Sequence, residues 1–259
     1  MNCSMVSFII LEYKSLNEVE NCISNIQEMC GNLDYEIIVS SNSQYPKDQQ
    51  NEVESKLKSA RFVFNEKNGG FSYGMNRGME VAKGDYMIIC NSDVKIASEL
   101  LVMVDYMQNN PDVGVVGPRI EDEQGNVQDS CRDYVSFPAL LKRQIKRIFT
   151  RKDVIPQKNF DYDKIQDVDW VIGAFLMIRS SVYREIGGFD ENNYFMYAED
   201  VDLCLRVRKK GYRICYFPKF IVKFKGTRKA RTSFKFAKIF LQSHFKLWQK
   251  YGFFCLKKS

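Results

Sequence analysis

The sequence has few of the side chains that bind zinc. It contains one histidine, His244, and its eight cysteines include no C-x-x-C pair and no regular spacing. Because a structural zinc site needs four cysteine or histidine ligands, the sequence predicts none. Cys90 and Cys204 lie within apolar patterns, so we expect reduced thiols in the core.

Long hydrophobic runs are also missing. The longest, residues 170–178, has nine residues, whereas a helix that spans a bilayer needs about 20. The first residues do not show the basic region and apolar core of a secretion signal. We therefore expect a cytoplasmic protein.

Common nucleotide and hydrolase motifs are absent or poorly placed. There is no G-x-G-x-x-G and no G-x-x-x-x-G-K-[ST], so neither a dinucleotide-binding fold nor a P-loop is supported. Residues 70–74 match G-x-S-x-G, and a serine hydrolase would combine Ser72 with an acid and His244. A nucleophile elbow requires a strand that runs directly into the first glycine, but residues 65–69 intervene. Serine hydrolysis is therefore a remote alternative.

Acidic residues are missing from the last part of the chain. Residues 203–259 contain 17 Lys or Arg and no Asp or Glu, whereas the first 202 residues contain 21 basic and 32 acidic side chains. Such a basic segment favours an anionic partner, either nucleic acid or a membrane surface. We expect no nucleic acid, because no recognised motif is present and the rest of the chain is negatively charged.

The end of this basic segment has the pattern of an amphipathic helix. Lysines and glutamines lie largely opposite an apolar stripe. Such a helix either docks on the core or lies at a membrane interface, and both options stay open. We therefore expect one domain, 1–230, with an appended helix, 231–259, that either is part of the same domain or contacts the inner face of the plasma membrane. The stripe consists of Phe234, Ala237, Leu241, Phe245, Trp248 and Tyr251.

What the chain does contain is an alternation of apolar strands and amphipathic helices. Short apolar runs typical of buried strands alternate with segments of helical spacing. The pattern predicts a three-layer α/β domain with a mostly parallel central sheet. The expected strands are 6–11, 36–39, 61–64 and 86–90, and the expected helices are 17–30, 75–83 and 203–210. Residues 119–168 are less regular and include a basic stretch, 142–147.

Two groups of acidic side chains are candidates for chemistry. Asp93 follows an apolar strand, where a carboxylate can hold Mg²⁺ or Mn²⁺ together with a diphosphate. Asn91, Ser92 and Asp93 also favour a simple turn. The stretch FMYAEDVDLCLR, residues 195–206, places three acids at the start of a helix, where they can act as caps. Capping does not explain the preceding aromatic residues, which would suit a sugar beside a general base.

Together these segments resemble family-2 glycosyltransferases, which have the GT-A fold, and in particular their rhamnosyltransferase-like branch. VSFIILEYKS resembles the family's first strand, EIIVSSNS its second, and NGGFSYGMNRGMEVAKGDYMIICNSDV its glycine-rich loop and N-x-D strand. The segment from WVIGAFLMIRSS to YAEDVDLCLRVRKKGYR matches that branch almost position for position. The resemblance covers nearly the whole chain in collinear order.

The resemblance implies inverting transfer of a sugar from a UDP- or dTDP-sugar to a hydroxyl of a saccharide or lipid-linked acceptor, in cell-surface polysaccharide biosynthesis. Asp200 would be the general base, and Asp93 would bind the Mg²⁺ or Mn²⁺ ion. The nucleotide would be held by Tyr13, Ser41, Asn42, Lys67, Asn68, Gly69, Asn76, Asn91 and Ser92. The donor sugar and acceptor would lie near Trp170, Gly173, Ala174, Glu199 and Lys223.

The sequence departs from the family pattern at two positions. Ser41 stands where the family usually has an Asp that contacts the base, and Lys223 stands where it commonly has a His beside the metal. A lysine can pair directly with a diphosphate. These departures leave strict metal dependence open and motivate an alternative, a non-catalytic sugar-nucleotide binding protein on the same fold.

Overall fold

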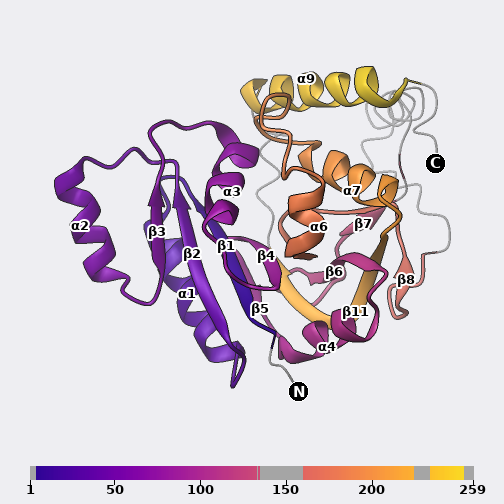
Figure 1. Ribbon diagram of the computed structural model, residues 1–259, viewed down its shortest axis with the longest axis horizontal. Helices are drawn as coiled ribbons and strands as arrows, with labels where there is room; N and C mark the ends of the chain where they lie inside the picture. The colour runs from indigo at the N-terminus through magenta and orange to yellow at the C-terminus, as the bar shows by residue number, and fades with distance from the viewer. Residues whose placement is uncertain (1–3, 133, 135–159, 225–233, 254–259) are drawn as a thin grey trace.

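The computed structural model describes residues 4–132, 134, 160–224 and 234–253, which form an α/β structure around one main sheet (Figure 1). Parallel pairing joins β3, β2, β1 and β4, and it also joins β6 and β11, whereas β10 runs antiparallel between β4 and β6. The predicted mostly parallel sheet is therefore confirmed. The strand order is β3 (Arg61–Phe64), β2 (Tyr35–Ser41), β1 (Val6–Glu12), β4 (Tyr86–Asn91), β10 (Phe175–Arg179), β6 (Val113–Glu121), β11 (Arg213–Phe224) and β5 (Val94–Ile96).

Short strands extend the main sheet and form a second, two-stranded one. β8 (Gln166–Asp167) pairs with β11, while β7 (Cys131–Arg132) and β9 (Trp170–Val171) pair with each other. This small sheet brings the irregular middle of the chain next to the segment that precedes β10.

Helices cover both faces of the sheet, and each face has its own hydrophobic core. One core joins the sheet to α1 (Leu16–Met29), α2 (Lys47–Lys56) and α4 (Leu101–Asn109). The other joins it to α3 (Gly70–Glu80), α6 (Ser180–Glu185) and α7 (Glu199–Lys209). These two cores on opposite faces give the predicted three layers. A last helix, α9 (Phe234–Tyr251), lies across the top of the molecule over α7 (Figure 1).

The predicted strands are confirmed to within two residues, but two helices begin earlier than predicted. α3 begins at Gly70 instead of residue 75, because Gly70 has a φ of +86° and turns the chain directly into the helix. α7 begins at Glu199 instead of residue 203. Helix α2 was not predicted, because its one buried side chain, Val53, gives no helical pattern. The basic stretch 142–147 lies outside the described residues.

Within the described part of the chain, no helix combines the length and apolarity needed to cross a bilayer. The six cysteines in that part are free and buried, including Cys90 and Cys204, as predicted.

Candidate active site

Polar strand ends meet along one edge of the sheet. The register pairs Glu12 of β1 with Ser41 of β2, Leu11 with Asn91 of β4, and Ser41 with Phe64 of β3. Because these four strands are parallel, their carboxyl ends lie together, and this is where open α/β sheets bind ligands. The structure therefore brings the predicted nucleotide residues from three strands to one edge.

A buried carboxylate that the sequence analysis missed lies at the centre of this edge. Glu12 is fully buried, and its Oε2 accepts a hydrogen bond from Ser41 Oγ at 2.5 Å. Its Oε1 accepts bonds from Ser43 Oγ and from the backbone N–H of Ser15, both at 2.9 Å. Ser41 is also fully buried, so its hydroxyl serves this network. Glu12 ends an apolar run just as Asp93 follows one, so the same sequence signal could have identified it.

A network of asparagines links the end of β2 to the glycine-rich loop. Asn42 is almost fully buried, and its Nδ2 donates to Asn68 Oδ1 at 3.3 Å and to Gly70 O at 3.0 Å. Asn65 Nδ2 donates to Asn42 Oδ1 at 2.9 Å, and Gly70 N–H donates to Asn68 Oδ1 at 3.1 Å. Asn42 and Asn68 therefore set the shape of the loop.

Two more predicted nucleotide residues are exposed beside this network. Tyr13 is 49% exposed at the end of β1. Lys67 Nζ lies 5.3 Å from the centre of the Tyr73 ring, next to Gly69. An added Cβ on Gly69 would collide with the Tyr73 side chain, so this position requires glycine. Tyr13 offers an aromatic face and Lys67 a positive charge at the rim of the site.

The loop after β4 fits a divalent cation that also binds a diphosphate. Asp93 is exposed there, and the neighbouring Ser92 hydroxyl donates to Glu18 Oε2 at 3.2 Å. No group of three or more His, Cys, Asp or Glu side chains in the described residues could hold a metal alone. Mg²⁺ sites that bind phosphates usually use only one or two carboxylates, with substrate and water oxygens completing the shell. One exposed carboxylate beside a hydroxyl meets that requirement.

Positive charge lies next to this loop. Lys223 of β11 pairs in register with Lys95 of β5, and β5 directly follows Asp93. Both lysines are exposed. The predicted position of Lys223 near the diphosphate is thus accompanied by a second cation, Lys95, that the sequence analysis did not single out. Two ammonium groups in this position can bind an anion directly, whether or not a metal ion also binds that anion.

The Asp200 carboxylate is held by two backbone hydrogen bonds at the start of α7. Its Oδ2 accepts from Gly173 N–H at 3.0 Å, and its Oδ1 accepts from Val201 N–H at 2.8 Å. The next residue after Gly173, Ala174, accepts from Asn91 N–H at 2.9 Å. This short path connects Asp200 to the end of β4, two residues before Asp93. The predicted residues Gly173 and Ala174 therefore link Asp200 to the strand that precedes Asp93.

Glu199 and Asp200 are adjacent carboxyl groups, and the pKa of each is raised, but by different causes. Burial, followed by the charge of Asp200, raises the pKa of Glu199 well above its usual value, and Glu199 Oε2 has no hydrogen-bond partner. Burial also raises the pKa of Asp200, but its two backbone N–H bonds and the charge of Arg132 oppose that rise. Of the two carboxyls, Glu199 therefore binds a proton more readily, and Asp200 loses its proton first. An ionised carboxylate with a raised pKa has the properties of a general base.

Arg132 is a further residue that the sequence analysis missed. Its guanidinium lies 5.4 Å from the centre of the Trp170 ring and forms an ion pair with Asp129 at 2.6 Å. Its positive charge also opposes the rise in the pKa of Asp200. No sequence signal pointed to Arg132, since its strand β7 has only two residues. Trp170 was predicted to lie near the donor or acceptor, and Arg132 adds a cation beside it.

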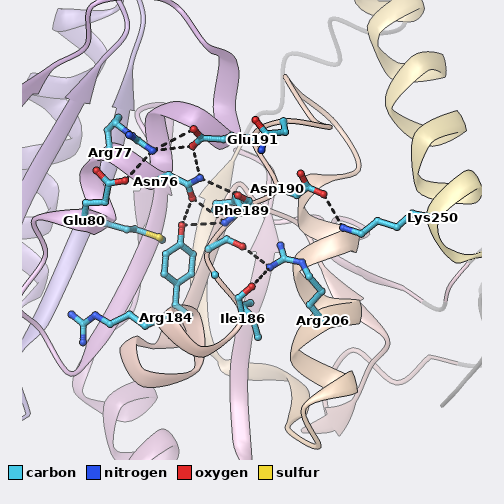
Figure 2. A pocket seen from close by; sticks show the side chains of 15 residues that line it. Asn76, Arg77, Glu80, Arg184, Ile186, Phe189, Asp190, Glu191, Arg206 and Lys250 are labelled. Carbon is cyan, nitrogen blue, oxygen red and sulfur yellow. Dashed lines mark hydrogen bonds and ion pairs between the residues drawn. The ribbon is translucent and has the colours of Figure 1, made fainter.

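Asn76 has a structural role that differs from the predicted nucleotide contact. Its Nδ2 donates to Phe189 O and Glu191 Oε2, and its Oδ1 accepts from Tyr183 O–H and Phe189 N–H. It lines a pocket of about 650 Å³ between α3 and the loop after α6, and Figure 2 shows it beside Phe189 and Glu191. All its hydrogen-bonding groups are engaged in tying α3 to that loop, so the prediction gains no support here.

Asp202 does not cap α7, contrary to the simple capping interpretation. It is fully buried, and its carboxylate accepts hydrogen bonds from Arg206 Nε at 2.7 Å, Lys250 Nζ at 2.7 Å and Tyr251 O–H at 2.8 Å. No side chain caps the first turn through the residue before the helix, Ala198. Asp202 instead attaches α9 to α7.

The structure excludes the serine hydrolase alternative. Ser72 is fully buried inside α3, and its hydroxyl has no hydrogen-bond partner. His244 Nδ1 is paired with Phe240 O at 2.9 Å, and no hydrogen bond or ion pair among the described residues joins its ring to a carboxylate. Burial lowers the pKa of His244 to about 4. Neither residue has the partner that a catalytic triad requires.

Comparison with known proteins agrees with this geometry. The family model for glycosyl transferase family 2 matches residues 7–187, and a model for glycosyl transferase family group 2 matches residues 143–259. The chain belongs to glycosyl transferase family 2. The predicted resemblance is therefore confirmed.

Named relatives of this family-2 chain include two rhamnosyltransferases. It is 30% identical over 164 residues to the rhamnosyltransferase WbbL of Escherichia coli K12, an alignment that covers 59% of this chain and 60% of WbbL. It is 32% identical over 142 residues to the N-acetylglucosaminyl-diphospho-decaprenol L-rhamnosyltransferase of Mycobacterium tuberculosis, covering 52% and 45%. The alignments thus span about half of the length of these relatives.

Solved structures support the GT-A fold. GalNAc-T7, in a crystal structure with UDP, GalNAc and Mn²⁺, superposes with a TM-score of 0.63 at 14% identity, covering 86% of this chain and 44% of that one. The mannosyltransferase PcManGT of Pyrobaculum calidifontis, in complex with GDP-Man and Mn²⁺, gives 0.60 at 17% identity, covering 94% and 64%. At these identities the likeness concerns the fold alone.

Proposed function

We propose that this family-2 chain is an inverting glycosyltransferase that moves a sugar from a UDP- or dTDP-sugar to an acceptor hydroxyl in cell-surface polysaccharide biosynthesis. The observation that carries the proposal is the Asp200 carboxylate, which is fixed by hydrogen bonds from Gly173 N–H and Val201 N–H at the start of α7. In the reaction, the acceptor oxygen attacks the anomeric carbon, its proton passes to Asp200, and the nucleoside diphosphate leaves from the opposite side.

The departing diphosphate needs positive charge. Asp93, with the oxygens of Asn91 and Ser92, would hold a Mg²⁺ or Mn²⁺ ion, which would neutralise the developing negative charge when bound. Lys223, together with Lys95, supplies fixed positive charge beside that loop. This arrangement supports catalysis with a bound metal ion. Because lysines can also pair directly with the diphosphate, the reaction would depend less strictly on that ion.

The nucleoside would lie along the edge formed by β1, β2 and the glycine-rich loop. Tyr13 supplies an exposed aromatic face, and Lys67 and Gly69 line the rim. Buried hydrogen bonds beneath this surface fix the strand ends and the loop, and they involve Ser41, Asn42 and Asn68. Glu12, which is buried next to Ser41, places a carboxylate at the edge where the family usually has an Asp. This carboxylate argues against the alternative of a non-catalytic binding protein.

A lipid-linked acceptor and a place on the cytoplasmic face of a membrane complete the proposal. The name of the Mycobacterium tuberculosis relative specifies an acceptor with a diphosphate and a polyprenyl chain. Arg132, whose guanidinium lies over the Trp170 ring, is a suitable cation for an acceptor phosphate. The basic segment 203–259 favours an anionic membrane surface.

The test is a panel of UDP-, dTDP- and GDP-sugars, with and without Mn²⁺, read by thermal shift and by nucleotide release. We expect donor-dependent release that Asp200→Asn reduces by roughly 100-fold or more while nucleotide binding survives. The exposed Asp105→Asn on α4 is the matched control and should behave as wild type. Undiminished transfer by Asp200→Asn would remove the base assignment, and binding of a donor without any transfer would favour the binding-protein alternative.

A further inference from the structure

One face of α9 holds the loop that leads into the candidate base. Ser243 Oγ donates to Met196 O at 2.8 Å, and the Phe240 ring packs edge-on against Tyr197 with centres 5.6 Å apart. At the other end of the helix, Lys250 binds the buried Asp202 of α7. Helix α9 therefore contacts both the loop before Asp200 and the helix that carries it.

This loop needs such support because its backbone is strained. Tyr197 and Ala198 have φ values of +69° and +65°, and each non-glycine residue in this region costs about 1–2 kcal/mol. On the side away from α9, Phe195 O accepts a hydrogen bond from Phe71 N–H at 2.7 Å. The loop is thus held between the start of α3 and the inner face of α9, directly before Glu199.

The opposite face of α9 is apolar and exposed. Phe234, Leu241 and Phe245 are 90%, 61% and 48% exposed, and their spacing of seven and four residues places them in one row. The predicted apolar stripe is therefore divided: Trp248 is buried against the protein, while these three side chains face outward. Docking on the core and contact with a membrane, the two options that the sequence left open, are both compatible with this helix, because each uses a different face.

The charges around this row favour a membrane over a protein surface of mixed charge. Lys235 and Lys238 are exposed on the same helix, whereas the Lys246 ammonium donates to Asn193 O at 2.9 Å. Residues 203–259 contain no acidic side chain that would repel an anionic lipid. A row of large apolar side chains bordered by lysines is typical of a helix that lies in the interface of an anionic bilayer.

We propose that the outer face of α9 docks on an anionic bilayer, and that the inner face of the same helix transmits this docking to the loop before Asp200. A helix is about 10 Å thick, so docking sets the loop that precedes the base about one helix diameter from the lipid surface. The site then opens toward an acceptor anchored in that bilayer, a step that rests on the proposed function. The docking itself does not depend on it.

Vesicle flotation of the full chain tests docking. Wild type should bind phosphatidylglycerol vesicles at low salt and lose most binding on phosphatidylcholine vesicles or at high salt. The variant Phe234→Ser/Leu241→Ser/Phe245→Ser should bind at least about 100-fold more weakly. The matched control is Leu101→Ser/Val102→Ser, which removes exposed apolar side chains from α4 and should bind as wild type.

Two outcomes would overturn the docking surface. One is equal vesicle binding by the triple variant and wild type. The other is a wild-type oligomer in light scattering that the triple variant alone dissolves, because the row would then bind a second copy of the chain. Both readouts are independent of transfer, so docking can succeed where the proposed function fails.

Hydrogen exchange tests the link to the loop. Anionic vesicles should slow exchange of the backbone amides at residues 195–200 in wild type. Ser243→Ala, which loses the hydrogen bond to Met196 O, should still bind vesicles but lose most of that slowing. Ser24→Ala, which removes a serine hydroxyl from α1, is the control and should keep it. Equal slowing in Ser243→Ala, or none in wild type, would refute the link.

Discussion

The backbone N–H of Gly173 donates a hydrogen bond to the Asp200 carboxylate at 3.0 Å, which joins the segment before β10 to the first turn of α7. Gly173 and Asp200 are 27 residues apart in sequence, and the bond fixes one carboxylate oxygen beside the strand ends. The other oxygen is fixed by Val201 N–H, so the side chain cannot rotate freely. The candidate base is thus oriented before any substrate binds.

Glu199→Gln should make stability less dependent on pH. Burial raises the pKa of Glu199 above its ordinary value of 4.5, so the folded state prefers the protonated form. The contribution of that proton to stability is complete below pH 4.5 and is lost as the pH rises toward the folded pKa. Wild type should therefore lose stability relative to Glu199→Gln by up to about 1.4 kcal/mol per pH unit in that window.

Denaturant unfolding of both proteins from acidic to neutral pH measures this difference. Glu28→Gln, an exposed substitution on α1, is the control and should run parallel to wild type across the same range. A constant difference between wild type and Glu199→Gln would show that Glu199 does not hold the proton of the pair.

Gly70→Ala should disturb the site more than its backbone geometry alone requires. Gly70 has a φ of +86°, and an added Cβ would collide with the Phe195 backbone carbonyl. Gly125 has a similar φ of +81° but open space around it, so Gly125→Ala isolates the conformational cost of about 1–2 kcal/mol. We expect Gly70→Ala to cost roughly 3 kcal/mol or more and to reduce transfer as well. Equal unfolding free energies for the two variants would contradict the close approach.

Glu12→Gln should weaken nucleotide binding as well as stability. The amide would place an N–H₂ group against the hydroxyl donor of either Ser41 or Ser43, at a cost of about 1–3 kcal/mol. Glu36→Gln is the matched control, because Glu36 accepts hydrogen bonds from Ser7 Oγ and Lys83 N–H, both at 2.6 Å, at the opposite end of the sheet. Both variants should unfold earlier in denaturant. In calorimetry, only Glu12→Gln should lose affinity for UDP or dTDP, and equal affinities would remove Glu12 from the site.

Most of the sheet and the local signs of catalysis were accessible from the sequence. Apolar runs predicted β1 to β4, because strands buried on both faces need continuous hydrophobic residues. The polar residues that follow them, such as Asp93, were also visible, as was the acidic stretch around Asp200. The features missed depend on contacts between distant segments: Glu12 gains its meaning from Ser41 on the neighbouring strand, and Arg132 from Trp170 38 positions later.

The position of α9 could not be predicted for the same reason. Its periodicity showed an apolar stripe but not which part of the stripe would dock. Which part of the stripe docks depends on Asp202. Local spacing does not show whether this residue caps α7 or pairs with a distant cation. Only the folded chain shows that Lys250 and Tyr251 reach it across 48 and 49 positions.

Asp202→Asn should release α9 from α7. Asp202 is fully buried and binds Arg206, Lys250 and Tyr251, so the substitution removes the negative charge that pairs with the two cations and leaves a single oxygen for the three donors. Breaking a buried ion pair in this way costs about 3–5 kcal/mol. Asp112→Asn is the control, because Asp112 pairs with Arg213 at an exposed position, where an ion pair contributes little to stability. Denaturant unfolding measures both costs, and limited proteolysis should cut Asp202→Asn first at the lysines of α9. A variant whose stability and cleavage pattern match those of Asp112→Asn would show that Asp202 does not hold the helix.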